Sequence, residues 1–349
     1  MKLRFHKCRL QLAHKWKIAN AKGSRVDEVI IVELTDDDGI TGLGEAPPSA
    51  VYRETPQAVL NFYKRVDATQ FSFDDVARSM AYLETLAPMP SAARCGINTA
   101  LLDGAAKRAG KPLYDFLKLG FREKHHVTSF SIGIDSPEII RKKVLAAKNY
   151  PVLKLKVGVA HDRENLATLR SIAPDKPVRV DANEAWKTKE RALANLEWLA
   201  GNGHIQFVEQ PMPRKASSQD LKWLKERSPL PVFADESCQT IADIPRCAEF
   251  FHGVNVKLVK AGGVSMAYET LQAARRAGLK TMIGCMIETS VLISAATHLA
   301  ELADFLDLDG NLLITKDPYA GVTAEKGILS FAKAKEKSGL RVVKRALGF

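Results

Sequence analysis

Short apolar stretches alternate with amphipathic helical patterns over the second half of the chain. Each apolar stretch ends in polar residues, and a pattern with apolar positions three and four apart separates it from the next. The stretches lie in HVTSFSIG, PVLKLKVG, VRVDAN, FVEQP, FADES, VNVKLV, MIGCMIE and FLDLDG. Eight strands with seven intervening helices predict an α/β fold, a (β/α)7β barrel in which the last helix of a TIM barrel is missing or displaced.

The N-terminal part of the chain follows a different pattern. Strand-like stretches come first, with the DDDG turn at residues 36–39 between two of them, and helical patterns follow near residues 55–68, 73–86 and 91–109. Strands first and helices later predict an α+β domain. We therefore expect an α+β domain over residues 1–120, the barrel over residues 121–310, and a segment over residues 311–349 that packs back on the first domain.

Charge and cysteine content narrow the classes of function. The formal net charge of +11 raises the possibility of a nucleic-acid or membrane-surface role, but the lysines and arginines are scattered and form no run of five. Five cysteines without a CxxC pair favour a reducing compartment. Because no apolar stretch matches a signal sequence or a membrane span, we expect a cytoplasmic protein that binds neither nucleic acid nor membrane.

Single carboxylates follow three consecutive strands of the predicted barrel. Asp181, Glu209 and Asp235 are 28 and 26 residues apart, about one strand-plus-helix unit each. The carboxyl ends of barrel strands meet at one mouth, so these residues are expected to converge. Each alone is typical of a turn or a helix N-cap, but three oxygen ligands at matching strand ends favour Mg²⁺. The chain has no HExxH motif, cysteine cluster or histidine pair that would indicate zinc.

Lysine-bearing strands flank the three acidic ones. Lys154 and Lys156 are two residues apart and share a strand face, and the apolar residues between and beside them suit packing under helices. The same argument turns Lys257 inward, whereas Lys260 is expected at or beyond the end of its strand. We expect burial beside another ammonium and a cation to lower the pKa of the paired lysines and give a neutral base. Such a set removes a proton from a carbon beside a carboxylate, so the sequence predicts an enzyme.

The last strand ends in a pair of aspartates. Asp307 and Asp309 are two apart and face the same way. A calcium loop is excluded, because the twelfth position counted from Asp307 is Pro318 and not glutamate. A solvated acidic turn is one interpretation, and an anionic clamp for a substrate ammonium group is the functional one.

These motifs together resemble the enolase superfamily, in its muconate-lactonizing subgroup, and within it the dipeptide epimerases. KLKVG, DAN, EQP, ADES and KLVKAGG correspond to the subgroup's paired lysines, three metal ligands and opposing lysine, and DLDG is the more selective motif. GLGEAPP and INTALLDGAAKRAGKPLYDFL resemble its capping domain, whose loops near residues 16–26 and 47–54 close over the barrel mouth. The resemblance covers nearly the whole chain.

The resemblance implies a Mg²⁺-dependent isomerase that inverts the α-carbon of the C-terminal residue of a dipeptide, such as L-Ala-L-Glu, by 1,1-proton transfer through an enediolate. Lys156 and Lys257 would act from opposite faces, with Lys154 neutralising carboxylate charge. The implied substrate contacts are Asp307, Asp309, Cys285, Met286, Ile287 and Ser131. A homo-oligomer is expected. Either Lys22 or Arg25 could meet a glutamate side chain of the substrate, which leaves the preferred second residue open.

Other functions share parts of this pattern. o-Succinylbenzoate synthase, N-succinylamino acid racemase and muconate cycloisomerase carry the same metal and lysines but have no need of an aspartate pair. Sugar-acid dehydratases of the superfamily use a histidine base late in the barrel, and no histidine stands at a strand end here. A basic nucleic-acid-binding protein is the alternative of another class, and it predicts salt-dependent binding to DNA or RNA.

Overall fold

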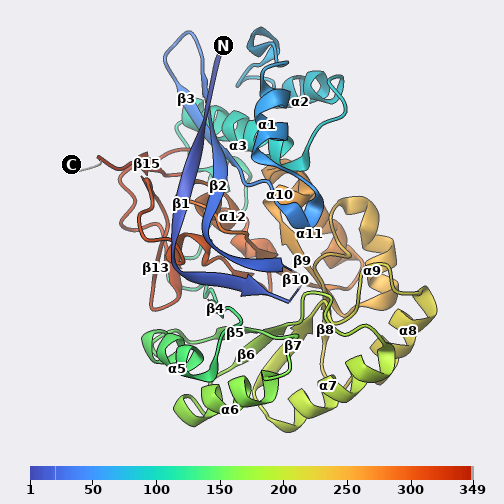
Figure 1. The fold of residues 1–349 in the computed structure, drawn as a ribbon. Helices are drawn as coiled ribbons and strands as arrows, with labels where there is room; N and C mark the ends of the chain where they lie inside the picture. Colours follow the sequence, from blue (N-terminus) through green and yellow to red (C-terminus); the bar gives the residue numbers. More distant parts are fainter. Residues whose placement is uncertain (20, 347–349) are drawn as a thin grey trace.

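The computed structural model describes residues 1–19 and 21–346, without the side chains of residues 21 and 22. Its centre is an eight-stranded sheet in which each strand pairs with the next in the chain (Figure 1). The strands are β4 (Phe130–Ile132), β5 (Leu153–Lys156), β6 (Val178–Asp181), β7 (Ile205–Glu209), β8 (Val232–Ala234), β9 (Gly253–Lys257), β10 (Lys280–Gly284) and β11 (Phe305–Asp307). A parallel bridge between Thr128 and Leu306 joins the two edges and closes the barrel.

Helices connect the barrel strands on the outside. They are α5 (Pro137–Ala146), α6 (Asp162–Ile172), α7 (Lys189–Gly201), α8 (Ser218–Arg227), α9 (Ile244–Phe250), α10 (Leu258–Ala261), α11 (Val264–Arg276) and α12 (Ser290–Thr297). With α10 and α11 forming one connection, the predicted (β/α)7β barrel is confirmed. Ser136 stands at the N-cap position of α5 with Pro137 in the first turn, although the Ser136 hydroxyl bonds Glu138 rather than a backbone amide.

The interior of the barrel has two tiers. In the lower tier, Phe207, Phe233 and Met282 are buried together, and the rings of the two phenylalanines stack with centroids 4.2 Å apart. The buried Arg179 guanidinium lies 5.7 Å from the Phe207 ring centroid. Alternate residues of a strand face the same side, so positions two residues further along point inward at the mouth. This upper tier is polar and contains Lys156, Asp181, Glu209, Asp235, Lys257 and Asp307.

The N-terminal residues form a cap over the barrel mouth. Its antiparallel sheet contains β1 (Lys2–Ile18), β2 (Ala21–Thr35) and β3 (Thr41–Ala46), and its helices are α1 (Pro56–Tyr63), α2 (Val76–Glu84), α3 (Ser91–Arg108) and α4 (Leu113–Phe116). Gly42 and Gly44 let β3 lie directly on α3, since an added Cβ would stand 2.0 Å from a helix carbonyl oxygen at either position.

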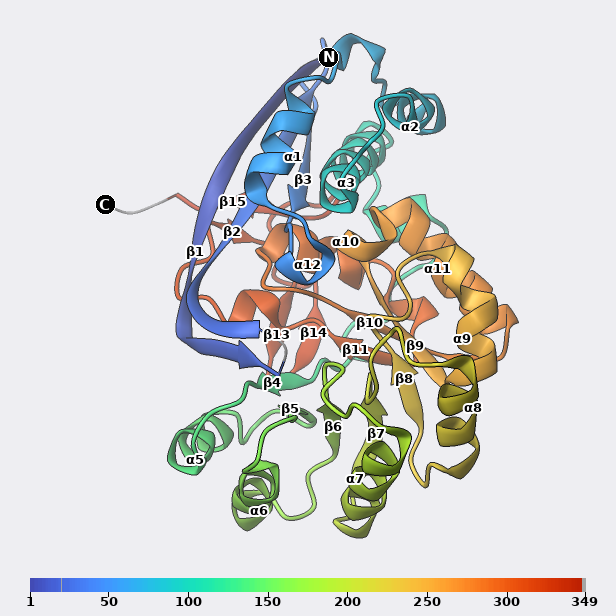
Figure 2. The ribbon, with the colours of Figure 1, turned by 45° about the vertical axis from the view of Figure 1, so that its right-hand side comes forward.

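The prediction of a loop over residues 16–26 is wrong in its conformation. β1 runs on to Ile18 and β2 begins at Ala21, so residues 16–18 and 21–26 belong to the ends of a long strand pair rather than to an irregular loop. The pairing register shifts between Gln11 and Trp16 and again before Ile18. Such irregularities bend a strand pair, and in both ribbon views the ends of β1 and β2 curve down to the barrel (Figure 2).

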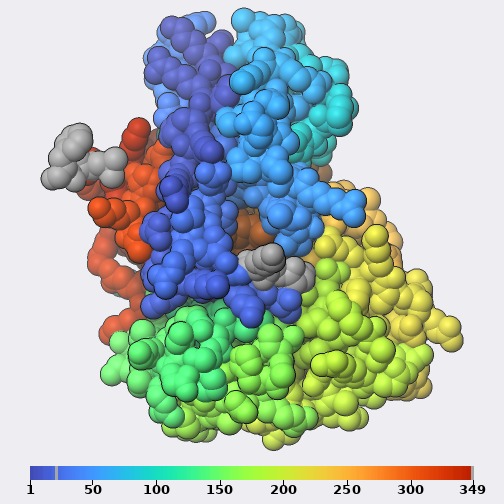
Figure 3. All heavy atoms as spheres, in the orientation of Figure 1, coloured from blue at the N-terminus to red at the C-terminus, as the bar shows by residue number. Residues whose placement is uncertain are grey.

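Specific contacts hold the cap on the barrel. The Glu45 carboxylate, from β3, accepts hydrogen bonds from the Thr289 backbone nitrogen (2.9 Å) and hydroxyl (2.6 Å) and so caps the start of α12. The C-terminal segment also contacts the cap: Leu113 donates to the Gly339 carbonyl (2.8 Å), and Leu340 donates to Asp103 (2.7 Å). Figure 3 shows the cap, in blue, lying against the green and yellow face of the barrel.

The five cysteines are free thiols. Among residues 1–19 and 21–346, no helix combines the length and apolar character needed to span a bilayer.

Candidate active site

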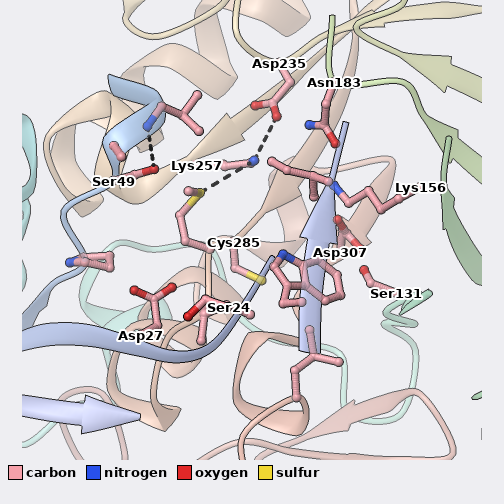
Figure 4. Close-up of a pocket in the computed structure, with 18 of the residues that line it drawn as sticks. Ser24, Asp27, Ser49, Ser131, Lys156, Asn183, Asp235, Lys257, Cys285 and Asp307 are labelled. Atoms are coloured by element: carbon pink, nitrogen blue, oxygen red, sulfur yellow. Dashed lines mark hydrogen bonds and ion pairs between the residues drawn. The ribbon is translucent and has the colours of Figure 1, made fainter. Parts of the chain in front are cut away.

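A cavity of about 270 Å³ lies at the barrel mouth beneath the cap. The barrel contributes Lys156, Asp235, Lys257 and Asp307 of its upper tier. The cap contributes Trp16 and Ile18 from β1, Ser24, Val26 and Asp27 from β2, and residues 47–52. Figure 4 shows the labelled side chains converging from both parts of the molecule. A pocket closed by two folding units excludes water and strengthens the electrostatic interactions inside it.

Three carboxylates lie at the bottom of this site. One oxygen from each of Asp181, Glu209 and Asp235 lies within 4.8 Å of the other two, and the three side chains are at most 1% exposed. Burial and the nearby charge of Asp181 raise the pKa of Glu209 to about 7. Acidic groups held this close need positive charge, and three buried carboxylates are the donor set that suits a hard divalent cation.

One oxygen of Glu209 supports this fit. Oε1 accepts a hydrogen bond from the Asn255 amide (2.6 Å), which fixes the carboxylate. Oε2 lies 2.6 Å from Lys154 Nζ, the distance of an ion pair, but no hydrogen bond reaches it. A buried carboxylate oxygen that faces positive charge fits a cation ligand, since its negative charge needs compensation.

Lys154 occupies the centre of the acidic groups. Its Nζ lies 2.7 Å from Asp307, 2.6 Å from Glu209 and 3.2 Å from Asp181. Burial acts to lower the pKa of Lys154, but these carboxylates outweigh it and hold the pKa well above its ordinary value. The carboxylates around Lys154 therefore favour its charged form, whereas the expected lowering of its pKa assumed a bound cation beside it.

Lys156 and Lys257 stand on opposite walls of the cavity. Lys156, at the end of β5, lies 2.5 Å from Asp181, and Lys257, at the end of β9, lies 2.9 Å from Asp235. The two strands are four positions apart in the eight-stranded order, which is half the circumference. Trp16 of the cap covers Lys156, with the ammonium 6.0 Å from the ring centroid. The cluster of three carboxylates thus lies between two amines.

The two aspartates of the last strand have different surroundings. Asp307 accepts a hydrogen bond from the Ser129 hydroxyl (2.6 Å) and pairs with Lys154. Asp309 accepts one from the Ser131 backbone nitrogen (2.6 Å), and burial together with the charge of Asp307 raises its pKa to about 7. Both line the cavity. A buried acid without a cationic partner of its own is suited to receive a substrate ammonium.

The other residues that the sequence singled out also lie at this cavity. Ser131, Cys285, Met286 and Ile287 line it. Cys285 Sγ is 4.0 Å from Asp309, and burial raises the pKa of this thiol well above its ordinary value, so it stays protonated. Asp181 and Glu209 are fully buried and do not line the cavity.

Several polar residues of the site escaped the sequence-based prediction. Lys260 is buried in α10 and donates to Asp235 Oδ1 and the Asp235 carbonyl, each at 2.6 Å. Asn183 donates to Glu236 (3.2 Å), and both line the cavity. Tyr52 reaches down from the cap, and burial followed by the charge of Asp235 holds its pKa well above the ordinary value.

The two candidates for contact with a substrate glutamate differ in what the structure shows. The side chain of Lys22 lies outside the described residues. Arg25 is exposed to solvent and does not line the cavity. Among the described side chains of the cap, the one that carries charge at the cavity is the acid Asp27.

Comparison with known proteins gives the family. Residues 11–118 match the mandelate racemase/muconate lactonizing enzyme N-terminal domain, and residues 140–313 match the enolase C-terminal domain-like family. The chain is 63% identical to L-Ala-D/L-amino acid epimerase of Pedosphaera parvula over 344 residues, covering 98% of this chain and 99% of that one.

Solved structures extend the likeness to the whole fold. The substrate-liganded L-Ala-D/L-Glu epimerase of Bacillus subtilis superimposes with a TM-score of 0.91 at 27% identity, covering 99% of both chains. The dipeptide epimerase of Enterococcus faecalis, complexed with Mg and L-Leu-L-Tyr, gives a TM-score of 0.87 at 27% identity, with 97% of this chain and 98% of that one covered.

The fold and the site together define a member of the enolase superfamily, in which a capped barrel holds a cluster of carboxylates between amines. The chain belongs, within that superfamily, to the dipeptide epimerase family, and it is an isomerase.

Proposed function

We propose that this protein is a magnesium-dependent dipeptide epimerase that inverts the α-carbon of the C-terminal residue. The observation that carries the proposal is the opposition of Lys156 and Lys257 across the cavity, each paired with a carboxylate of the same triad. Inversion needs a proton removed from one face of a carbon and another delivered to the opposite face, and two amines on opposing walls provide that pair.

Magnesium is the cation that we assign to Asp181, Glu209 and Asp235. When bound, it supplies positive charge that stabilises the enediolate form of the substrate carboxylate, a Lewis-acid effect worth several kcal/mol. The assignment rests on the all-oxygen donor set and on the burial of the three carboxylates close together. The combination of a lysine base with Mg²⁺ in enolase-superfamily sites is an established pattern.

The roles of the lysines follow from their positions. Lys156 takes the α-proton of one epimer, and Lys257 donates a proton to the other face; the reverse reaction exchanges the two roles. Lys154 lies deeper than Lys156 and keeps its charge among Asp181, Glu209 and Asp307. It therefore balances the acidic groups while the two outer amines transfer protons.

The substrate ammonium is assigned to Asp309 and Asp307. An ammonium at Asp309 supplies the cationic partner that this buried acid lacks among the described residues, and Ser131 holds the carboxylate in place. An N-succinylated or N-acetylated substrate has no such charge and would leave Asp309 unpaired. This favours a dipeptide over the substrates of N-succinylamino acid racemase or o-succinylbenzoate synthase. Cytoplasmic location and assembly into a homo-oligomer stay predictions.

Deuterium exchange in D₂O tests the two-base scheme. An L,L-dipeptide panel with the wild-type enzyme is expected to gain one mass unit and to yield the L,D epimer. Lys156→Ala and Lys257→Ala are each expected to stop epimerisation while retaining α-exchange of one epimer, and the retained epimer should differ between the two variants. Unchanged epimerisation in either variant contradicts the assignment.

A further inference from the structure

The part of the cavity that the cap contributes carries one acid whose role the proton transfer leaves unexplained. Asp27 of β2 lines the cavity and is partly buried. Its Oδ1 accepts a hydrogen bond from the Glu28 backbone nitrogen (2.9 Å), and that bond is local to the strand. Among the described side chains, no lysine, arginine or histidine forms an ion pair with Asp27. Burial raises the pKa of Asp27 to about 6, as expected of a carboxylate without a compensating charge.

The charge distribution around the cavity is asymmetric. Its lining lysines, Lys154, Lys156 and Lys257, all come from the barrel. Within the described part of the cap, the lining side chains other than Asp27 are uncharged. Figure 4 shows Asp27 beside Ser24, on the side of the cavity away from Asp235 and Asn183. A ligand group that reaches this wall therefore meets negative charge.

The direction of the substrate side chain follows from the proposed function, on which this inference rests. The carboxylate lies toward the triad of β6 to β8, the peptide nitrogen lies toward the aspartates at β11, and the lysines of β5 and β9 take the two faces of the α-carbon. A planar enediolate then has one direction left for its side chain. That direction is out of the barrel mouth, against the cap.

We propose that Asp27 is a specificity-determining residue, and that this enzyme prefers dipeptides whose C-terminal residue carries a cationic side chain, such as lysine or arginine. A lysine or arginine at this position gains a charge-assisted hydrogen bond with a carboxylate that has no other cationic partner. A glutamate side chain at the same position meets a like charge in a partly desolvated pocket, which is unfavourable.

Steady-state kinetics with three dipeptides tests this proposal. L-Ala-L-Lys, L-Ala-L-Leu and L-Ala-L-Glu are compared with the wild-type enzyme and with Asp27→Asn, which keeps the side-chain volume and removes the charge. We expect the wild-type kcat/KM to be highest for L-Ala-L-Lys and lowest for L-Ala-L-Glu. In Asp27→Asn, the ratio of the L-Ala-L-Lys to the L-Ala-L-Leu value should fall by about tenfold, as for loss of a charged hydrogen bond.

Glu28→Gln is the matched control. It removes the same charge from the next residue of β2, which does not line the cavity and pairs with Lys7 on the surface. We expect it to leave the three-substrate ratios as in the wild-type enzyme, which separates a contact in the pocket from general steering of charged substrates.

The outcomes distinguish this inference from the proposed function. A wild-type preference for L-Ala-L-Glu over L-Ala-L-Lys overturns the role of Asp27, whatever the variant does, and so does an unchanged substrate ratio in Asp27→Asn. Turnover of L-Ala-L-Leu leaves the epimerase function standing in both cases and shows that the variant is folded. Absence of exchange with every dipeptide overturns the epimerase function itself.

Discussion

Lys260 and Asp235 form a buried ion pair in which the ammonium contacts both the carboxylate and the backbone carbonyl of the same residue, each at 2.6 Å. Its third hydrogen bond goes to the Asn255 carbonyl at 2.9 Å. The Lys260 ammonium thereby fixes the position of Asp235 relative to β9. Because Lys260 does not line the cavity, it acts on the reaction only through Asp235.

Replacing this lysine should therefore affect stability and metal binding together. We expect Lys260→Met to lose roughly 3–5 kcal/mol of unfolding free energy, because it leaves a buried carboxylate with one fewer partner. Magnesium affinity should fall about 10–100-fold, as when a group that orients a ligand is removed. Urea unfolding and magnesium titration measure the two effects. Lys225→Met, which removes a lysine bonded to carbonyl oxygens on the outside of the barrel, serves as the control.

Removal of the metal should abolish activity reversibly. Chelation is expected to stop epimerisation, and added Mg²⁺ to restore it. Magnesium should also raise the free energy of unfolding, by about 2.7 kcal/mol at a hundredfold excess over its dissociation constant. Calorimetry in the presence and absence of Mg²⁺ checks this. Glu209→Gln should show little magnesium-dependent stabilisation; an equal shift in that variant contradicts the assigned site.

The charge of Asp309 should matter only for substrates with a free ammonium. We expect Asp309→Asn to raise the KM for a dipeptide at least about tenfold, the cost of losing a hydrogen bond between charged groups. Turnover of the N-acetylated dipeptide, which has no ammonium for Asp309 to bind, should change much less. Asp304 lies just before β11 and pairs with Lys280. As the control, Asp304→Asn should change the KM of neither substrate. Equal losses for both substrates would assign Asp309 a structural role.

His298 predicts a pH dependence of stability. It is fully buried, its Nδ1 accepts a hydrogen bond from the Tyr114 backbone nitrogen, and burial lowers its pKa from 6.5 to about 3. A histidine held neutral in the fold stabilises fully above its unfolded pKa. That stabilisation is lost as the pH falls from 6.5 toward 3, at about 1.4 kcal/mol per pH unit.

Urea titrations between about pH 7.5 and about pH 5.5 measure this dependence. His298→Asn, whose side-chain oxygen can accept the same hydrogen bond, should be less stable overall but lose less stability on acidification. His126 and His252 also have lowered pKa values and contribute in the same sense, so the difference between the variant and the wild-type protein is the informative quantity. An equal loss of unfolding free energy on acidification in His298→Asn and in the wild-type protein contradicts the prediction.

Much of this architecture could be predicted from the chain because strands impose a period of two. That period placed Lys154 and Lys156 on one face and aligned the strand ends, so the barrel and the convergence of its acidic residues followed from spacing alone. Lys260 could not be placed in this way. The chain turns helical immediately after Lys257, and the helical turn of α10 brings a residue three positions later back to Asp235.

The remaining differences have physical causes of the same kind. The KWKIANAKGSR segment lacks strict alternation of polar and apolar residues. The pairing of β1 with β2 shifts register twice near it. The sequence of such an irregular strand pair therefore resembles that of a loop. The pKa of Lys154 depends on which charges surround it in space, and Asp307 is 153 residues away in the chain. Spacing within a motif carries no information about such a partner.

The lower tier of the barrel, with Phe207 and Phe233, has a consequence for how such enzymes diversify. Packing of the barrel centre depends on Phe207 and Phe233, while the chemistry resides two positions further along the same strands, at Glu209 and Asp235. Substitutions of the reacting groups can therefore be selected without changes to the packing of the lower tier. A library that varies the cavity-lining side chains of the cap, and keeps the lower tier and the Lys260–Asp235 pair, should yield mostly folded proteins. This makes the scaffold a practical starting point for engineering new activities.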